Sequence, residues 1–147
     1  MNTFKITHPV TTEEFEQYYH LRWEILRKPW GQLRGSECDE LEKRSIHIMA
    51  TNETGNVLGV CRMHFIDKTK GQIRYMAVHP DQRGKGIGLS LLNEAEAIAK
   101  KNGIQWIILQ SRENAIGFYE RLGYHQIEKT FLLYDEIQHF LMEKALI

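Results

Sequence analysis

The glycine-rich segment from His79 to Leu89 contains the residues best suited to bind a charged ligand. Its sequence is His-Pro-Asp-Gln-Arg-Gly-Lys-Gly-Ile-Gly-Leu, and it follows a predicted strand and opens a predicted helix. Backbone N–H groups at the start of a helix lack intrahelical acceptors, and glycine lets a phosphate approach the backbone closely. Arg83 and Lys85 place positive charge beside those amides. The segment predicts a phosphate site, although a tight turn at a helix start is the simpler structural alternative.

The glycine spacing excludes two common phosphate-binding motifs. A dinucleotide fingerprint needs G-x-G-x-x-G, but the last position is Leu89 when counted from Gly84 and Leu91 when counted from Gly86. A P-loop needs serine or threonine after its Gly-Lys pair, whereas the pair in this loop is followed by Gly86. Neither a nicotinamide dinucleotide nor a nucleoside triphosphate is therefore the predicted ligand.

A second segment, Asn114 to Tyr124, carries polar and aromatic residues at helical spacing. Its sequence is Asn-Ala-Ile-Gly-Phe-Tyr-Glu-Arg-Leu-Gly-Tyr. Tyr119 shares a helix face with Phe118 and Leu122, so packing in the core explains it without catalysis. Asn114 suits the N-cap of the same helix. These residues alone leave open whether the tyrosine is catalytic or structural.

Candidates for a general base lie elsewhere in the chain. His64 and His139 fall on predicted strands, where a packed or solvated histidine is the more common finding. Glu37 and Asp39 belong to a polar loop, Trp30 to Glu42, whose carboxylates suit an amine. An irregular solvated loop is the simpler interpretation of that segment.

The hydrophobic pattern predicts ten elements that position these segments. Thr11 and Glu14 form a capping box, which predicts a helix that Pro29 and Gly31 end. A second helix is predicted from the Gly84 region to the Asn102-Gly103 cap signal, and a third covers Asn114 to Leu122. The predicted strands are Phe4–Thr7, Ser45–Thr51, Val57–Ile66, Gln72–Val78, Trp106–Leu109, Tyr124–Leu133 and Gln138–Lys144.

Composition limits the class of protein. The chain has 147 residues, with 19 Lys plus Arg against 19 Asp plus Glu, which argues against a nucleic-acid partner. A length of this size predicts one α+β domain over residues 1–147. Cys38 and Cys61 have no metal-binding or disulfide spacing, so we expect no metal. No signal peptide or membrane span is recognisable, so we expect no membrane association and a cytoplasmic location.

Two motifs in order resemble those of one family. Arg83-Gly84-Lys85-Gly86-Ile87-Gly88, an R-x-x-G-x-G pattern after Met76-Ala77-Val78, resembles the acetyl coenzyme A loop of the GNAT N-acetyltransferases. Asn114 to Tyr124 resembles the second GNAT motif, N-A-x-x-F-Y-x-x-x-G-[FY]. The resemblance covers roughly residues 45–133. It implies a short single-domain member with a mixed, mostly antiparallel central sheet, helices on both faces and the order β-α-βββ-α-β-α-ββ.

The resemblance also implies roles for particular residues. Tyr119 would be the general acid that protonates the departing thiolate, while the base stays unassigned among His64, His139 and Glu37. Some members carry a glutamate early in the strand before the loop, where this chain has Gln72. The residues implied in coenzyme binding are Met76, Ala77, Val78, Arg83, Gly84, Lys85, Gly86, Ile87, Gly88, Leu89 and Asn114.

Two functions follow as hypotheses. The first is an N-acetyltransferase that moves an acetyl group from acetyl coenzyme A to a primary amine by direct transfer in a ternary complex. The second is a noncatalytic acyl coenzyme A sensor, which Gln72 keeps open because it does not titrate. The partners are acetyl coenzyme A and an amine acceptor, with no nucleic acid and no membrane. A homodimer is implied by the family only.

Overall fold

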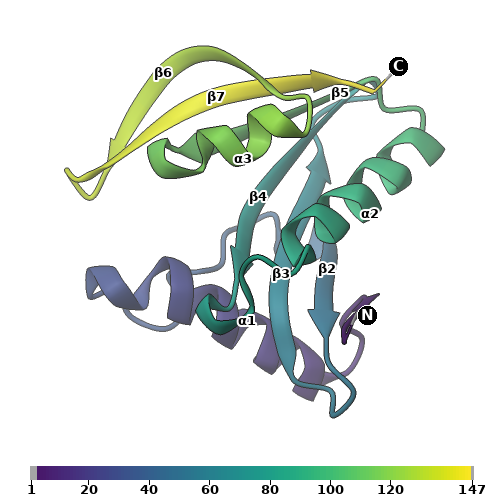
Figure 1. Ribbon diagram of the computed structural model, residues 1–147, viewed down its shortest axis with the longest axis vertical. Coiled ribbons are helices and arrows are strands. Elements are labelled where there is room, and N and C mark those ends of the chain that lie inside the picture. The colour runs from purple at the N-terminus through teal and green to yellow at the C-terminus, as the bar shows by residue number, and fades with distance from the viewer. Residues whose placement is uncertain (1–2, 147) are drawn as a thin grey trace. The chain divides into compact units, whose positions relative to one another are not determined.

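The computed structural model describes residues 3–146, so residues 1, 2 and 147 of the predicted domain lie outside the described part. The element order is the predicted β-α-βββ-α-β-α-ββ, with short 3-10 turns between elements (Figure 1). The bounds are β1 (Lys5–Thr7), α1 (Thr12–Leu26), β2 (Ile46–Thr51), β3 (Val57–Phe65), β4 (Lys70–Val78), α2 (Ile87–Lys101), β5 (Trp106–Arg112), α3 (Ile116–Arg121), β6 (His125–Leu133) and β7 (Ile137–Ala145).

The strands form a seven-stranded sheet in the order β1-β2-β3-β4-β5-β7-β6. The β4–β5 pair is parallel, whereas β1–β2, β2–β3, β5–β7 and β6–β7 are antiparallel. The predicted mixed, mostly antiparallel α+β fold is therefore confirmed. By internal contacts the described chain forms two compact units, residues 3–64 with 75–95, and residues 65–74 with 96–146. That a single domain spans residues 1–147 stays a prediction.

Helix α1 begins where the capping box places it. The Thr11 hydroxyl accepts a hydrogen bond from the Glu14 N–H at 3.1 Å, and the Glu14 carboxylate accepts one from the Thr11 N–H at 2.9 Å. The bonds from Thr11 and Val10 amides lower the pKa of Glu14. Two N–H groups that the helix leaves without acceptors are thus satisfied reciprocally.

In the first unit, α1 and α2 cover opposite faces of the sheet. Tyr18 and Leu21 of α1 belong to one buried cluster with Val60 of β3. At the preceding residue of that strand, a Cβ added to Gly59 would lie 2.8 Å from the Ile87 Cγ2 of α2. Because successive strand residues point to opposite faces, the two helices lie on opposite sides, as predicted (Figure 1). Glycine at position 59 allows α2 to pack closely.

In the second unit, α3 lies along the β6–β7 hairpin (Figure 1). Glu96 of α2, 8% exposed, accepts hydrogen bonds from the Tyr124 hydroxyl at 2.9 Å and the Lys144 ammonium at 2.8 Å. This buried carboxylate is therefore paired and hydrogen-bonded, as burial of a charge requires. Glu96 thereby connects α2 to Tyr124, the residue before β6, and to Lys144 of β7 within the unit.

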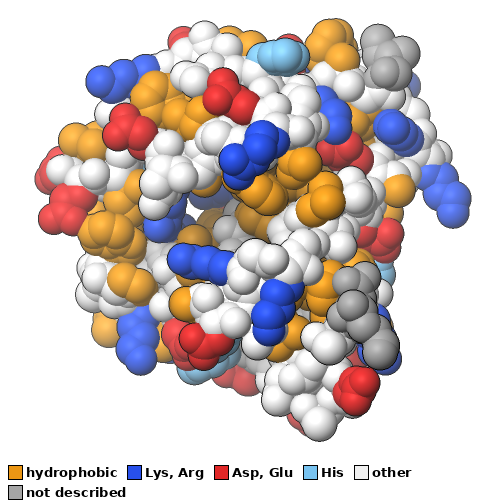
Figure 2. Space-filling model, in the orientation of Figure 1, with side chains coloured by type: hydrophobic (Ala, Val, Ile, Leu, Met, Phe, Trp, Pro, Cys, Tyr) orange, Lys and Arg blue, Asp and Glu red, His pale blue; other side chains and the backbone are white. Residues whose placement is uncertain are grey.

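Charged side chains of both signs are interspersed over the face shown in Figure 2. On that face the two signs of charge are mixed rather than gathered into separate patches. Among residues 3–146, no helix is both long enough and apolar enough to span a membrane.

Candidate functional site

The glycine loop before α2 adopts backbone conformations that require glycine. Gly84 has φ 80° and Gly86 has φ 83°, both in the left-handed region that side chains with a Cβ disfavour. A Cβ added at either position would meet nothing within 4 Å. Glycine here therefore serves the backbone turn, and the space above it is open to a ligand.

The first turn of α2 presents amides to that space. Ser90 N–H donates to the Gly86 carbonyl at 3.0 Å, which starts the helix. The amides of residues 87–89 consequently precede the first intrahelical bond and have no acceptor in their own helix. The helix starts at Ile87 and not near Gly84 as predicted, because the two left-handed glycines interrupt helical geometry.

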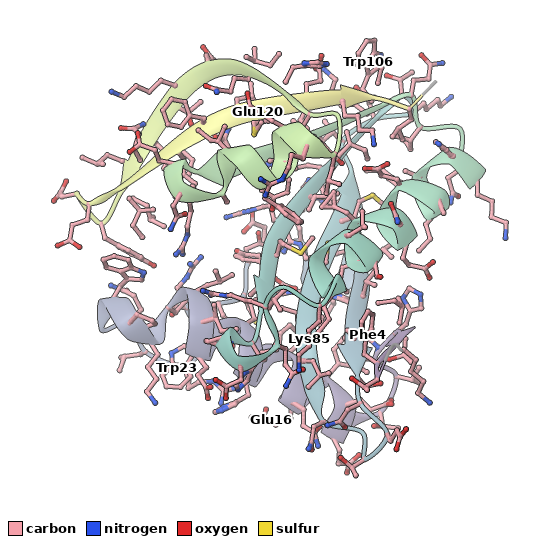
Figure 3. All side chains as sticks on the ribbon, viewed as in Figure 1. Phe4, Glu16, Trp23, Lys85, Trp106 and Glu120 are labelled. Atoms are coloured by element: carbon pink, nitrogen blue, oxygen red, sulfur yellow. The ribbon has the colours of Figure 1, made fainter. Side chains whose placement is uncertain are left out.

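The charges around this loop favour an anion. The first turn of α2 contains no acidic residue, and Arg83 and Lys85 are exposed. Figure 3 shows Lys85 on the loop, where its ammonium lies 3.2 Å from the Gln82 side-chain oxygen. Amides, a helix dipole and two cations fit the pyrophosphate of a coenzyme A molecule in charge and in hydrogen-bonding capacity.

The strand end before the loop is anchored to its neighbour. The His79 N–H donates to the Leu58 carbonyl at 2.8 Å. Ala77 is buried in the α1-facing cluster, while Met76 and Val78 are half-buried. The Ala77 side chain is thus a core residue, and the backbone of this predicted coenzyme segment carries the N–H and C=O groups that could pair with a ligand.

Asn114 does not cap α3 as predicted. It lies in the 3-10 turn Glu113–Ala115, and the cap residue of α3 is Ala115, with no side-chain hydrogen bond. The Ile116 N–H instead donates to the Glu113 carbonyl within that turn. The cap prediction was wrong because a 3-10 turn intervenes and shifts the helix start to Ile116. Asn114 is exposed on this turn.

Tyr119 is buried in an aromatic group. It is 7% exposed, and its ring makes edge contacts with Phe118 at 5.1 Å and Tyr124 at 5.8 Å between centroids. The Tyr124 N–H also donates to the Tyr119 carbonyl at 3.1 Å. The structure therefore places Tyr119 in the packed interior of its unit, as the helical spacing predicted.

Two of the three base candidates are held by local contacts. The His139 ring, 6% exposed, donates through Nδ1 to the Ile137 carbonyl at 2.9 Å and stacks on Phe131 at 4.3 Å. Glu37 is 3% exposed and accepts a hydrogen bond from the Gly35 N–H at 2.8 Å. His64 is half-buried near the end of β3. These contacts hold the His139 and Glu37 side chains in place, and neither contact identifies its residue as the group that transfers a proton.

The loop after α1 is tied into the protein and is not the solvated loop that we predicted. Glu42 Oε2 accepts hydrogen bonds from Arg22 at 3.0 Å and from Arg62 at 2.7 Å. Arg62 also binds both carboxylate oxygens of Asp39, at 2.6 and 3.1 Å. The guanidiniums of Arg22 and Arg62 are fully buried, so these ion pairs are largely shielded from water.

This arginine cluster, defined as Arg22, Arg62, Asp39 and Glu42, was missed from the sequence. Burial alone lowers the pKa of Arg62, but the hydrogen bonds that it donates to Asp39 and the charge of Glu42 outweigh this effect, and the pKa is raised. Two positive charges face two negative ones, so the cluster is neutral. The carboxylates of Asp39 and Glu42 are occupied by arginine and are no acidic patch for an amine, contrary to one prediction.

A histidine extends the cluster. The Nε2–H of the neutral His47 ring donates to the Glu42 carbonyl at 2.8 Å, and Nδ1 lies 3.0 Å from the Tyr18 hydroxyl oxygen. Burial lowers the pKa of His47, which favours that neutral form. A pocket of about 450 Å³ adjoins this histidine and is lined by His8, Pro9, Phe15, Tyr19, Glu42, Lys43, Ser45, Ile46 and His47.

The two cysteines are not activated. Burial raises the pKa of Cys61 to about 12, and burial together with the carboxylates of Glu42 and Glu37 raises that of Cys38 to about 11. A thiolate, not a thiol, is the effective nucleophile. Within residues 3–146, no three His, Cys, Asp or Glu side chains form a group that could hold a metal ion.

Comparison with known proteins identifies relatives over nearly the whole chain. The sequence model of the acetyltransferase (GNAT) family matches residues 15–124. A Bacillus subtilis protein whose name proposes acetyltransferase activity is 31% identical over 151 residues, covering 98% of this chain and 96% of that protein.

Solved structures share the fold. A GNAT-family acetyltransferase of Staphylococcus aureus has a TM-score of 0.81 at 18% identity, covering 98% of this chain and 99% of that one. An aminoglycoside 6'-N-acetyltransferase complexed with coenzyme A also has a TM-score of 0.81 at 18% identity, with 97% of each chain covered. At this identity the likeness establishes the fold and not the acceptor.

Proposed function

The chain belongs to the GNAT family of acetyltransferases, and from this premise we propose that it transfers the acetyl group of acetyl coenzyme A directly to a primary amine within a ternary complex. Membership makes it an N-acetyltransferase that uses an acyl coenzyme A and an amine acceptor. The acetyl donor, the direct transfer and the residue roles below are the proposed part.

One observation carries the coenzyme assignment. The left-handed glycines Gly84 and Gly86 have open space above them, and the amides that start α2 follow directly. We assign the amides from Arg83 to Leu89 to the pyrophosphate, with the two cationic side chains near the phosphates. The backbone of Met76 to Val78 is assigned to the amide-bearing arm of the coenzyme, as an added strand pairs with an exposed edge. Asn114, exposed on its turn, is assigned a further coenzyme contact.

The reaction needs three functions from the chain. The amine nitrogen forms a bond to the acetyl carbon as the carbon–sulfur bond breaks; the amine loses a proton and the sulfur gains one. Backbone amides near Ala77 and Val78 are assigned to the developing oxyanion, and the Tyr119 hydroxyl to protonation of sulfur. The general base that accepts the amine proton is not assigned. Single substitutions of His64, His139 and Glu37 test each of these residues in that role.

Binding and turnover test the proposal separately. Calorimetric titration of the purified protein with acetyl coenzyme A is expected to show saturable binding, and a panel of primary amines is expected to include one that drives thiol release. Absence of binding contradicts the proposal at its first step. Hydrolysis without an amine serves as the background rate.

Family membership indicates an enzyme, so the noncatalytic sensor remains only as the alternative that Gln72 favours. This residue lies in β4 opposite Ile108 and stands where some family members carry a titratable glutamate. An amide side chain cannot accept the proton of an amine at neutral pH. Binding of acetyl coenzyme A without thiol release across a wide amine panel supports the sensor, whereas amine-dependent release excludes it.

A further inference from the structure

Tyr75 has a backbone conformation that a strand residue of its size rarely adopts. It lies within β4 and has φ 57°, in the left-handed region. For a bulky side chain this conformation is strained and persists only where the surroundings enforce it. The residue directly precedes Met76 to Val78, the backbone segment to which the proposed function assigns the coenzyme arm.

Buried guanidinium groups surround the Tyr75 ring. Arg22 lies 4.4 Å and Arg62 lies 4.9 Å from the ring centroid, and Arg27 lies 5.6 Å away. Arg22 and Arg62 are fully buried. Attraction between a cation and an aromatic ring is strongest when the cation is desolvated, so these two arginines hold the ring most firmly.

The arginine cluster prevents the two guanidiniums from moving away. Arg62 is bound by both oxygens of Asp39, and Glu42 bridges Arg62 and Arg22. The Tyr75 hydroxyl lies 3.5 Å from the second Asp39 oxygen, at the limit of a hydrogen bond. The loop carboxylates thus fix the arginines, and the arginines fix the ring.

We propose that Arg22 and Arg62 clamp the Tyr75 ring and so keep its left-handed backbone, which aims the peptide groups of Met76 to Val78 at the coenzyme. A left-handed residue inside a strand turns the peptide groups that follow it away from the regular pleat. Tyr75 is therefore a positioning residue, acting through the backbone. This inference rests on the proposed coenzyme assignment.

Three substitutions test the clamp by the dissociation constant of acetyl coenzyme A. Tyr75→Gly tolerates the left-handed backbone but lacks the ring, and is expected to raise the constant about tenfold as the segment samples other conformations. Tyr75→Phe keeps the ring and is expected to recover most of the affinity. Arg62→Lys keeps the charge but loses the planar stack, and is expected to fall between them.

Tyr134→Gly is the matched control. Tyr134 also has a left-handed backbone, φ 52°, but lies in the turn between β6 and β7 and outside the assigned coenzyme segments. This variant is expected to bind acetyl coenzyme A as the wild type does. Equal affinities of Tyr75→Gly and Tyr75→Phe would overturn the clamp.

Amide chemical shifts of Met76, Ala77 and Val78 in the ligand-free protein give a second readout. They are expected to move in Tyr75→Gly and Arg62→Lys and to stay near wild type in Tyr75→Phe. Unmoved shifts in Arg62→Lys overturn the clamp even if coenzyme binds. If the shifts move in Tyr75→Gly and Arg62→Lys but the wild type binds no coenzyme, the proposed function is rejected and the clamp remains as a structural device. If Tyr75→Gly does not fold, the clamp is tested by the amide chemical shifts of Arg62→Lys and by its affinity for acetyl coenzyme A.

Discussion

The guanidinium of Arg62 on β3 forms a bidentate ion pair with the carboxylate of Asp39, Nη1 to Oδ1 at 2.6 Å and Nη2 to Oδ2 at 3.1 Å. Arg62 is fully buried and Asp39 is 15% exposed. The pair joins the central sheet to the loop after α1. Removing one partner would leave a buried charge with reduced compensation, which is the costly way to break such a pair.

Asp39→Asn is therefore expected to lower the free energy of unfolding by about 3 kcal/mol, measured by urea denaturation. Glu16→Gln is the matched control, because Glu16 pairs with Arg34 at 3.1 Å on the surface, with side chains 67% and 38% exposed. An exposed pair contributes little, so the control is expected to stay within about 0.5 kcal/mol of wild type. Equal losses in the two variants would contradict the buried role of the Arg62 pair.

Gly86→Val tests the coenzyme loop. Strain at a left-handed backbone is expected to cost about 1–2 kcal/mol, and the new side chain fills the open space above the loop, so acetyl coenzyme A affinity is expected to drop more than about tenfold. Gly55→Val is the control: Gly55 has φ 85° with nothing within 4 Å, but lies in the turn between β2 and β3. Denaturation is expected to show equal destabilisation of Gly86→Val and Gly55→Val. Calorimetry is expected to show weakened acetyl coenzyme A binding in Gly86→Val alone. Unchanged affinity there would refute the phosphate assignment.

Tyr119→Phe tests the proposed acid. Loss of the hydroxyl is expected to lower turnover by about 100-fold and to leave the acetyl coenzyme A dissociation constant nearly unchanged. Tyr124→Phe removes the neighbouring hydroxyl that donates to Glu96 at 2.9 Å, so it is expected to reduce stability and not turnover. Thiol-release kinetics and calorimetry separate the two effects. An unaltered rate in Tyr119→Phe would return this residue to a purely structural role.

The stability of the protein is expected to depend on the protonation of His47. Its pKa is lowered by burial from the ordinary 6.5, so the unfolded chain binds a proton at a higher pH than the native protein does. The contribution of the neutral ring is therefore full above pH 6.5 and is lost as the pH falls below that value.

Urea denaturation at pH 7 and pH 5 measures this dependence. His47→Gln is expected to be less sensitive to the change than the wild type. His125→Gln, an exposed position on β6, is expected to keep the wild-type sensitivity. A wild-type slope in His47→Gln would show that other groups cause the pH dependence.

Much of the secondary structure could be predicted because its causes are local. The capping box of Thr11 and Glu14 starts α1 with residues three positions apart. The Asn52 side chain accepts hydrogen bonds from the amides of Thr54 and Asn56, which closes the hairpin turn between β2 and β3. The prediction failed at Asn114, which lies in a 3-10 turn before α3 instead of capping that helix.

The sequence by itself thus determined the element order, the glycine loop and the two family motifs, since each depends on residues within a few positions of one another. Only the tertiary structure decided the arginine cluster and the clamp on Tyr75. Glu42 lies 20 residues from both Arg22 and Arg62, and Asp39 lies 36 residues from Tyr75. No local pattern links such distant residues, because the packing of α1, β3 and the loop on one another brings these charges together and excludes water from the buried arginines.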